Sequence, residues 1–233
     1  MAEQKVAVIV GAGTGLSASL ARRFAKEGFA VALASRSTDK LAPLVKETGA
    51  KAYACDASEK DQVAALFANV DKDLGMPEVC VYNASRRARG PITDLDPDEV
   101  KAAVLTSAYG AFLVGQAAAK RMVPAGHGTI FFTGASAGVK GFPESAPFAM
   151  GKFGLRGLAQ SMARELQPKG IHVVHVVVDG PIANPGRAQM ANERGPDSLL
   201  DPASIAETYY QLYAQHRSAW SWEIEVRPWV EKF

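Results

Sequence analysis

Short runs of β-branched and other apolar residues alternate with longer amphipathic stretches along the whole chain. The short runs are typical of buried strands, and the longer stretches, with apolar positions at helical spacing, are typical of helices. The predicted strands are 6–10, 30–34, 51–54, 79–82, 129–133 and 172–178. The main predicted helices are 16–27, 60–74, 99–122 and 148–166.

This repeating strand and helix order predicts an α/β fold of three layers, with helices on both faces of a doubly wound, mostly parallel sheet. We expect a single Rossmann-type domain over 1–233, with ligands at the carboxyl ends of the strands. The segment 180–202, rich in Gly, Pro, Asn and Asp, follows the last of these strands. A loop of that length is expected to close over a substrate as a lid.

The last part of the chain, 220–233, predicts a final edge strand and a docked end. Its three tryptophans are spaced among charges, and their size suits anchors in the core or at an interface. They are Trp220, Trp222 and Trp229. We therefore expect them to be covered rather than to form a ligand cage.

Composition changes this picture mainly by excluding partners. The net charge of the 233 residues is +2 and the charges are well mixed, so we expect no nucleic-acid partner and no anionic membrane surface. No apolar stretch approaches the roughly 20 residues that span a bilayer, and no leader pattern is evident. Cys55 and Cys80 suit reduced core thiols, and the histidines form no recognisable metal-ligand set. A cytoplasmic location is expected.

The strongest chemical signal is the turn Gly11-Ala12-Gly13-Thr14-Gly15, between the first strand and a helix that begins at Leu16. Such a turn brings backbone N–H groups and the positive end of a helix dipole to one place, which favours a pyrophosphate. The motif predicts a dinucleotide site. Taken alone it leaves open a purely structural turn.

The end of the second strand bears on the choice of cofactor. A site for NAD commonly places a carboxylate there, which binds the ribose 2′-hydroxyl and would repel a 2′-phosphate. Here Ser35 occupies that position and Arg36 follows it. A guanidinium beside a small hydroxyl suits a phosphate, so NADP(H) is favoured over NAD(H). The alternative is that Arg36 is a solvated residue at a helix start.

Four segments, in this order and spacing, resemble the short-chain dehydrogenase/reductase family over essentially the whole chain. They are Val10 to Ser17, Cys55-Asp56-Ala57, Tyr82-Asn83-Ala84-Ser85 and Asp179-Gly180-Pro181-Ile182. The resemblance implies a Rossmann fold and an NAD(P)-dependent oxidoreductase. It departs from the family's pattern at several positions, because Val10 replaces a Thr, Ser17 replaces a Gly and Asp179-Gly180 replaces Pro-Gly.

The resemblance also implies cofactor contacts, one segment at a time. The glycine turn, with Gly11, Gly13, Thr14, Gly15 and Leu16, would meet the pyrophosphate. Asp56 and Ala57 would lie beside the adenine, and Asn83 and Ala84 would follow the fourth strand at the site. Backbone groups around Gly180 and Ile182 would meet the nicotinamide carboxamide.

The catalytic positions match the family only in part. The family uses a Tyr-x-x-x-Lys pair, a Ser thirteen residues before the Tyr and an upstream Asn. Lys152 is retained, and the resemblance implies that it hydrogen-bonds the nicotinamide ribose. Phe148 stands in place of the Tyr, Ala135 in place of the Ser and Ser107 in place of the Asn. A phenylalanine ring cannot donate a proton, so the expected site is non-standard.

Few side chains are candidates to replace the missing groups. Ser136, next to Ala135, would hydrogen-bond a substrate oxygen, or it belongs to a small-residue turn. Tyr82 and Tyr109 carry phenols that either approach the site or are tied up by packing. Asp179 would stabilise an oxidised nicotinamide or cap the turn that follows it. The arginines at 86, 87 and 89 would meet an acidic substrate or cofactor phosphates, or line a solvated loop.

Two functions of different classes remain. The first is an oxidoreductase that uses NADP(H) to pass hydride to a small apolar carbonyl or an activated C=C bond, with solvent or a substituted side chain delivering the proton. The second is a nucleotide-binding protein without turnover. The stretches 99–122 and 148–166 are apolar on more than one face, so a homodimer or homotetramer is expected.

Overall fold

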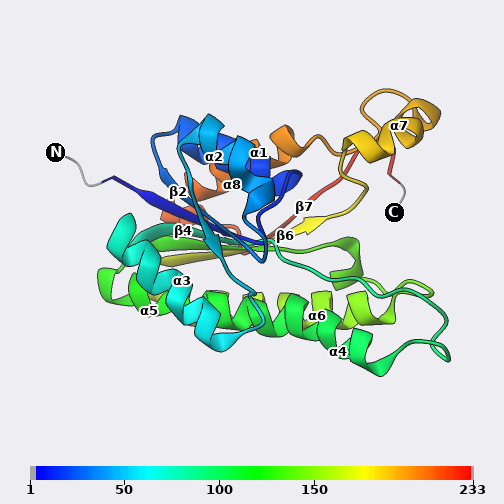
Figure 1. Cartoon of the computed structure of the whole chain (residues 1–233), viewed down its shortest axis with the longest axis horizontal. Coiled ribbons are helices and arrows are strands. Elements are labelled where there is room, and N and C mark those ends of the chain that lie inside the picture. The colour runs from blue at the N-terminus through cyan, green and yellow to red at the C-terminus, as the bar shows by residue number, and fades with distance from the viewer. Residues whose placement is uncertain (1–3, 232–233) are drawn as a thin grey trace.

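The computed structural model describes residues 4–231 as one seven-stranded parallel sheet with helices on both faces (Figure 1). The strand order is β3-β2-β1-β4-β5-β6-β7. The strands are β1 (Val6–Val10), β2 (Ala30–Ser35), β3 (Lys51–Ala54), β4 (Pro77–Tyr82), β5 (Gly128–Thr133), β6 (Ile171–Val178) and β7 (Glu223–Val226). The predicted three-layer Rossmann fold is confirmed, and the predicted edge strand of the tail is β7.

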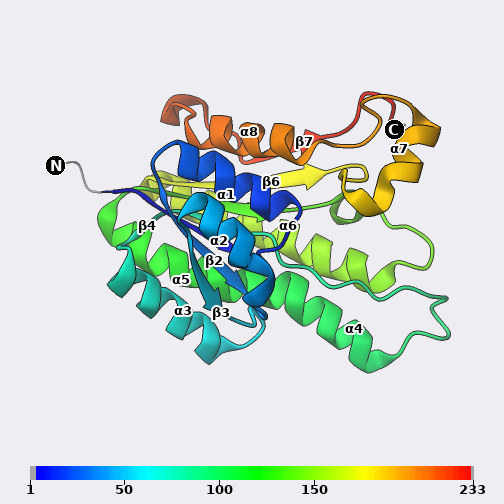
Figure 2. The ribbon, with the colours of Figure 1, turned by 45° about the horizontal axis from the view of Figure 1, so that its top comes forward.

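The helices form two layers, which Figures 1 and 2 show on opposite sides of the sheet. One layer holds α1, α2 and α8, and the other holds α3, α4, α5 and α6. Their bounds are α1 (Leu16–Lys26), α2 (Ala42–Thr48), α3 (Lys60–Asp73), α4 (Pro97–Val104), α5 (Gly110–Ala125), α6 (Ala146–Leu166), α7 (Ala188–Arg194) and α8 (Pro202–Tyr213).

The central strands read as continuous apolar runs because both of their faces are covered. In β1, Val6, Val8 and Val10 pack into the cluster under α3, α5 and α6. Ala7 and Ile9, which point the opposite way, pack into the cluster under α1 and α8. The two clusters fix the sheet between its helical layers, so the carboxyl ends of the strands are held rigidly at one edge.

The stretch predicted as one helix, 99–122, is two helices joined by a π-helical turn. The chain enters α4 two residues earlier than predicted, where the Asp96 carboxylate accepts from the N–H of Asp98 at 3.0 Å. The π turn, Leu105–Tyr109, then leads into α5. Insertions of this kind in a helix recur at functional sites.

The same helical run, 97–125, corrects the expectation that no apolar stretch approaches membrane-spanning length, because by length and composition alone it is sufficient. Its apolar residues have another explanation in the fold. Ala111, Val114, Ala118 and Met122 are fully buried in the cluster against the sheet. The run is therefore a core helix of the lower layer in Figure 1.

Two further expectations differ from the structure. The segment 180–202 is not wholly irregular, since it contains a 3₁₀ turn, Pro185–Arg187, and the short helix α7. Trp229 is not a core anchor within this chain, because 78% of it is exposed. Trp220 does pack, with its ring stacked on His172 at 4.7 Å between centroids, and Trp222 packs against the lower core cluster.

Candidate functional site

Three cavities lie in a row at the carboxyl ends of the strands. The first, of about 240 Å³, contains Arg36 and is called the Arg36 cavity. The second, of about 260 Å³, is the Lys152 cavity, and the third, of about 580 Å³, is the outer cavity. Asn83 and Ser85 line the first two, while Arg87 and Phe148 line the last two. The shared walls make the row continuous.

The turn after β1 is fixed by packing as much as by conformation. Gly11 has φ +85°, and a Cβ there would lie 2.4 Å from the backbone nitrogen of Ala84. The Ser17 hydroxyl donates to the Gly11 carbonyl at 2.9 Å and accepts from the Asn83 side-chain amide at 2.7 Å. Glycine is therefore required at Gly11 to let this turn close on the segment after β4.

The N-terminus of α1 keeps its first N–H groups free of side-chain caps. Aspartate side chains cap α4 and α8, whereas the N-cap of α1, Gly15, provides none. Thr14 and Gly15 are exposed, and a Cβ on Gly13 would meet no atom within 4 Å. Gly13, Thr14 and Gly15 line none of the three cavities, whereas Leu16 lines the Lys152 cavity. A helix start whose N-cap residue is exposed and carries no capping side chain suits an anion.

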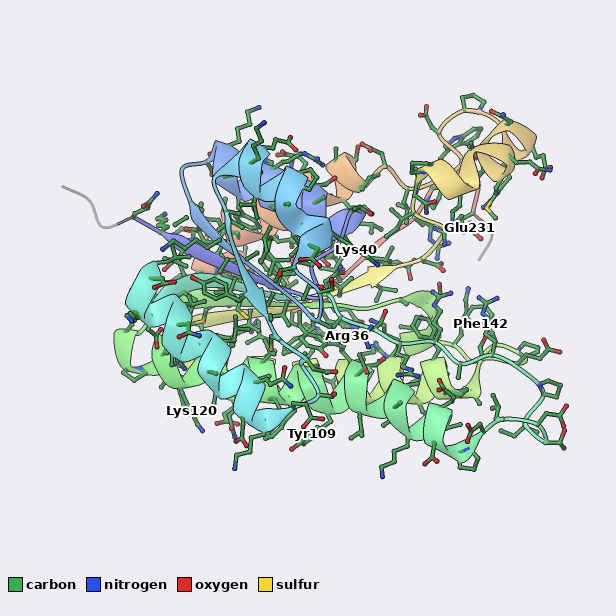
Figure 3. All side chains as sticks on the ribbon, viewed as in Figure 1. Arg36, Lys40, Tyr109, Lys120, Phe142 and Glu231 are labelled. Carbon is green, nitrogen blue, oxygen red and sulfur yellow. The ribbon has the colours of Figure 1, made fainter. Side chains whose placement is uncertain are left out.

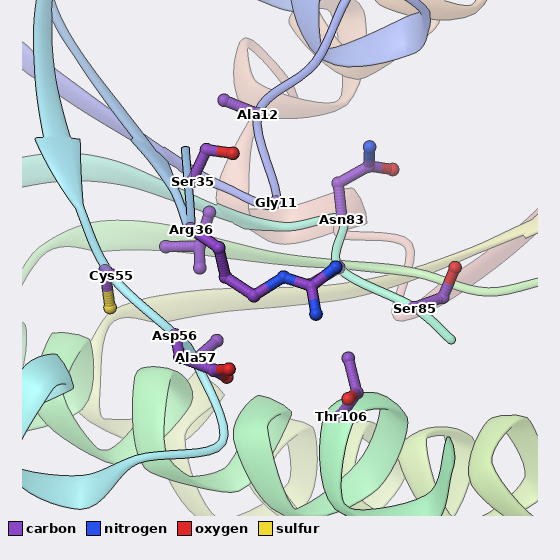
Figure 4. A pocket seen from close by; sticks show the side chains of 12 residues that line it. Gly11, Ala12, Ser35, Arg36, Cys55, Asp56, Ala57, Asn83, Ser85 and Thr106 are labelled. Carbon is purple, nitrogen blue, oxygen red and sulfur yellow. The ribbon is translucent and has the colours of Figure 1, made fainter. Parts of the chain in front are cut away.

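The Arg36 cavity collects most of the predicted nucleotide contacts. The Arg36 side chain extends across it (Figure 4) and has no salt-bridge partner within residues 4–231. Ser58 donates to the Asp56 carboxylate from its N–H at 2.9 Å and its hydroxyl at 2.6 Å. Burial opposes ionisation of Asp56, but these bonds and the charges of Arg36 and Arg86 outweigh it and lower its pKa. The predicted residues on this cavity are Gly11, Ser35, Arg36, Asp56, Ala57, Asn83 and Ala84.

Lys152 is buried in the wall of the Lys152 cavity, and no carboxylate among the described residues pairs with it. Only 3% of it is exposed, and its Nζ donates to the Thr133 carbonyl at 2.7 Å. Among the described residues it has no salt bridge, which is unusual for a buried lysine. Burial, reinforced by the charge of Arg87, lowers the pKa of Lys152 to about 7. A group perturbed in this way in a cavity wall is a candidate functional residue.

Phe148 lies one helical turn before Lys152 on α6, so the two side chains share a face. The Lys152 Nζ is 5.8 Å from the centre of the Phe148 ring. On the same ring lies the guanidinium of Arg87, with its Cζ at 4.1 Å from the centre. Desolvation and the charges of Arg89 and Arg187 lower the pKa of Arg87. Ala135 lines the same two cavities as Phe148.

The structure separates the two predicted serines. Ser136 begins a 3₁₀ turn after β5 and lines the outer cavity. Ser107 is fully buried in the π turn, where it packs against α6. A Cβ added to Gly151 of α6 would lie only 2.6 Å from the Cβ of Ser107. Ser107 lines none of the three cavities, although its neighbour Thr106 lines the Arg36 cavity.

The candidate phenols do not reach the row of cavities. The Tyr82 hydroxyl donates to the carbonyl of Thr106, which holds the π turn. Tyr109 is 41% exposed and points away from the sheet (Figure 3), stacked on Phe112. Tyr82 therefore contributes to packing, and Tyr109 lies on an outer surface.

The segment after β6 supplies contacts that the sequence did not indicate. Asp179 is buried, and its carboxylate accepts from the Arg227 guanidinium at 2.7 Å. Arg187 donates to the Ile182 carbonyl at 2.6 Å, and both line the Lys152 cavity together with Gly180. Arg187 ends the 3₁₀ turn in the Gly- and Pro-rich segment 180–202, where no periodic pattern of apolar residues indicates it.

Beneath the Lys152 cavity, three further side chains link β6, β7 and α6. His175 is fully buried and its Nδ1 is 2.9 Å from the Glu223 carboxylate. Arg156 donates to the same carboxylate at 2.6 Å. Burial lowers the pKa of His175 despite this carboxylate. A Cβ on Gly134 would lie 2.3 Å from the His175 Nε2, so the network directly supports the cavity wall.

Comparison with known proteins identifies the family. A family model described as short chain dehydrogenase matches residues 5–194. The chain belongs to the short-chain dehydrogenase family. A 3β-hydroxysteroid dehydrogenase of Mediterraneibacter gnavus is 31% identical over 175 residues, which are 72% of this chain and 63% of that relative.

Solved structures of short-chain dehydrogenases share the whole fold. One from Rhodopseudomonas palustris is 36% identical with a TM-score of 0.84, and the match covers 97% of this chain and 99% of that one. A metagenomic short-chain oxidoreductase in complex with NADP is 30% identical, with a TM-score of 0.84 and coverage of 96% and 97%. The row of cavities thus lies on the Rossmann-like sheet of this family, at the edge where parallel sheets bind ligands.

Proposed function

We propose that this protein is an NADP(H)-dependent oxidoreductase that transfers hydride to or from a small carbonyl or activated alkene, with a non-standard active site. The observation that carries the proposal is Lys152, a buried lysine without a carboxylate partner among the described residues, in a cavity continuous with the Arg36 cavity. The NADP complex of the related metagenomic oxidoreductase supports the choice of cofactor class.

The residues present fit NADP(H). The uncapped start of α1 offers N–H donors to the pyrophosphate. Arg36 spans a cavity that also holds Ser35, so at the end of β2 a 2′-phosphate would meet a guanidinium and a hydroxyl, while the Asp56 carboxylate, which follows β3, lines the same cavity. This arrangement supports a preference for NADP(H) over NAD(H).

NADP(H), when bound, supplies or accepts a hydride at its nicotinamide ring. Lys152 would hydrogen-bond the nicotinamide ribose, and Ser136 in the outer cavity would contact the substrate. Phe148 and Ala135 stand where the family carries its Tyr and Ser, so neither can exchange a proton with the substrate oxygen. In reduction, the proton that accompanies the hydride then comes from solvent. This favours a conjugated alkene, whose carbon can be protonated by water after the hydride arrives.

Two features support accompanying proposals. Gly180, Arg187 and Met190 of the segment 180–202 line the outer cavity, which supports a role for that segment as a substrate lid.

Cys55 and Cys80 are free, buried thiols, and burial raises their pKa to about 11 and about 12. Inert reduced thiols suit the cytoplasm.

The test of the cofactor is a titration with NADPH and with NADH, followed by fluorescence and by thermal shift. We expect NADPH to bind more tightly than NADH. Arg36→Ala should weaken NADPH binding about tenfold or more, because a charge-assisted contact to phosphate is lost, and leave NADH binding unchanged. Equal loss for both nucleotides would contradict the phosphate role, and no binding of either would overturn the proposal.

The test of the chemistry compares the natural protein with the double variant Phe148→Tyr, Ala135→Ser on a panel of ketones and enones with NADPH. We expect slow turnover by the natural protein, mainly on enones. The double variant should raise ketone reduction by about a hundredfold, because a positioned general acid contributes on that order. NADPH binding without turnover in either form would instead favour a nucleotide-binding protein that does no chemistry, a role that the ring of Phe148 also permits.

A further inference from the structure

The outer cavity is lined by an excess of positive side chains. Arg87, Arg89, Lys140 and Arg187 all face it, from three separate segments of the chain. Phe142 and Glu231, from the loop after β5 and from the C-terminal end, contribute to its wall from different sides (Figure 3). The positive charge is therefore gathered by the fold and does not come from one basic run in the sequence.

The carboxylates of this cavity do not neutralise those cations. Asp179 is paired with Arg227 at 2.7 Å, and Glu231 is paired with Arg194 at 2.9 Å. Within residues 4–231, Arg87, Arg89, Lys140 and Arg187 form no salt bridge. Their neighbour Arg86, by contrast, is bound to Glu99 at 2.8 Å and lines none of the three cavities. The cavity thus keeps a net positive charge.

The position of these cations distinguishes a substrate from the cofactor. Arg89 and Lys140 line the outer cavity but neither the Arg36 cavity nor the Lys152 cavity. They are therefore separated from the glycine turn and the start of α1, where the cofactor phosphates are expected. Arg87 lines both the Lys152 and the outer cavity, at their junction on the Phe148 ring.

We propose that the outer cavity binds an organic carboxylate, whose carboxyl group is held by Arg89 and Lys140 while Arg87 donates to the reacting oxygen beside Phe148. Guanidinium and ammonium groups give charge-assisted hydrogen bonds to a carboxylate, and both Arg89 and Lys140 are exposed to solvent and accessible to one. Phe142, Phe148 and Met190 supply apolar wall for the carbon skeleton. A cavity of about 580 Å³ suits a small molecule of this kind.

This inference rests on the proposed function for its reaction, not for its binding step. Reduction of a bound oxo acid would consume one NADPH and one solvent proton and release NADP⁺, with the proton ending on the former carbonyl oxygen, or on the α-carbon where the substrate is an enone. The hydride forms the new C–H bond, and the carboxylate is unchanged. Arg87 would stabilise the negative charge that develops on the oxygen, since Phe148 has no hydroxyl to do so.

Binding can be measured without turnover in the presence of NADP⁺, which cannot reduce a ketone or enone. We would titrate 4-oxopentanoate, 4-oxopent-2-enoate and 3-benzoylpropanoate, each against its methyl ester, by calorimetry with and without NADP⁺. The acids should bind about tenfold more tightly than their esters, as expected for one lost charge-assisted contact. The double variant Arg89→Gln, Lys140→Gln should lose this selectivity while ester and NADP⁺ affinities stay unchanged. Arg86→Gln, which removes one positive charge nearby, should keep it.

Each outcome separates this inference from the proposed function. Selective binding of the acids without any NADP⁺ binding would overturn the proposed function and leave a carboxylate site. NADP⁺ binding with equal affinity for acids and esters, or with no binding of either, would overturn the carboxylate site. Selectivity that survives in the double variant, or that is lost to the same extent in Arg86→Gln, would also overturn it.

Discussion

Lys152 combines two properties that seldom occur together, a position in a ligand cavity and burial without a counter-charge among the described residues. Its pKa of about 7 means that it is a variable charge at neutral pH and not a fixed cation. From the sequence motif alone, Lys152 would be taken as permanently protonated. The structure shows that its ionisation is set by burial first and by Arg87 second.

The free energy of unfolding should report this pKa. In the unfolded chain the Lys152 pKa is near 10.5, so between pH 7 and 10.5 the unfolded state binds more protons. The cofactor-free protein should therefore gain stability as pH rises through this window, by at most about 1.4 kcal/mol per pH unit, relative to Lys152→Met. Below pH 7 the difference in the free energy of unfolding between the natural protein and Lys152→Met should not change with pH. Urea unfolding of both proteins from pH 6 to pH 9 measures it, and parallel curves would contradict the burial argument.

Among the elements, the turn between β1 and α1 separates two roles that glycine plays in one motif. Gly11 has φ +85° and no room for a Cβ against Ala84, while Gly13 has open space. We expect Gly11→Ala to destabilise the fold by about 1–3 kcal/mol, as strained backbone and overpacking do. Gly13→Ala should leave stability within about 0.5 kcal/mol and weaken NADPH binding. Thermal unfolding and NADPH titration distinguish them; equal destabilisation would contradict this division.

The elements themselves were largely predictable, because buried parallel strands read as short apolar runs and helices as long amphipathic ones. The π turn at Leu105–Tyr109 was not, since the apolar pattern continues through it. What fixes it is tertiary, namely the Tyr82 hydroxyl on one side and the close approach of Gly151 on the other. The helix α7 was missed because its Gly- and Pro-rich surroundings are typical of a loop.

The site was predictable where it follows strand ends and not where it depends on distant contacts. Gly11, Arg36, Asp56 and Asn83 meet at one cavity because parallel strands end at one edge. The pairing of Asp179 with Arg227 joins residues 48 apart in the chain, and no local pattern indicates it. The same holds for Arg87 on the ring of Phe148. The resemblance to the family placed Ser107 in the site, whereas packing turns it toward α6.

For the whole molecule, the outer surface of the lower helical layer is apolar where α6 lies beside the π turn and α5. Tyr109, Phe112, Met150 and Phe153 are each 41–55% exposed there. Exposed aromatic and methionine side chains gathered on neighbouring helices are typical of an interface. We propose that a second copy of the chain covers this surface in a symmetric homodimer or homotetramer.

Light scattering after size exclusion tests this assembly. The natural protein should have the mass of a dimer or tetramer, and Phe153→Glu should shift it towards the monomer, because a charge would be buried against apolar side chains. Ile92→Glu is the matched control, since Ile92 is 75% exposed but lies in the loop before α4 and not on α5, α6 or the π turn. A monomeric natural protein would contradict the proposal, as would equal effects of the two substitutions.

The strand order also determines at what stage of folding the Arg36 cavity forms. β1 pairs with β2 on one side and with β4 on the other, so the chain adds β2 and β3 on one side of β1 before it returns to add β4 on the other side. Closing such long loops is slow, and no hairpin is available to begin the process. The Arg36 cavity takes its walls from the ends of β1 to β4 and exists only after they have assembled. A nucleotide bound there would delay the loss of the native state without hastening its formation.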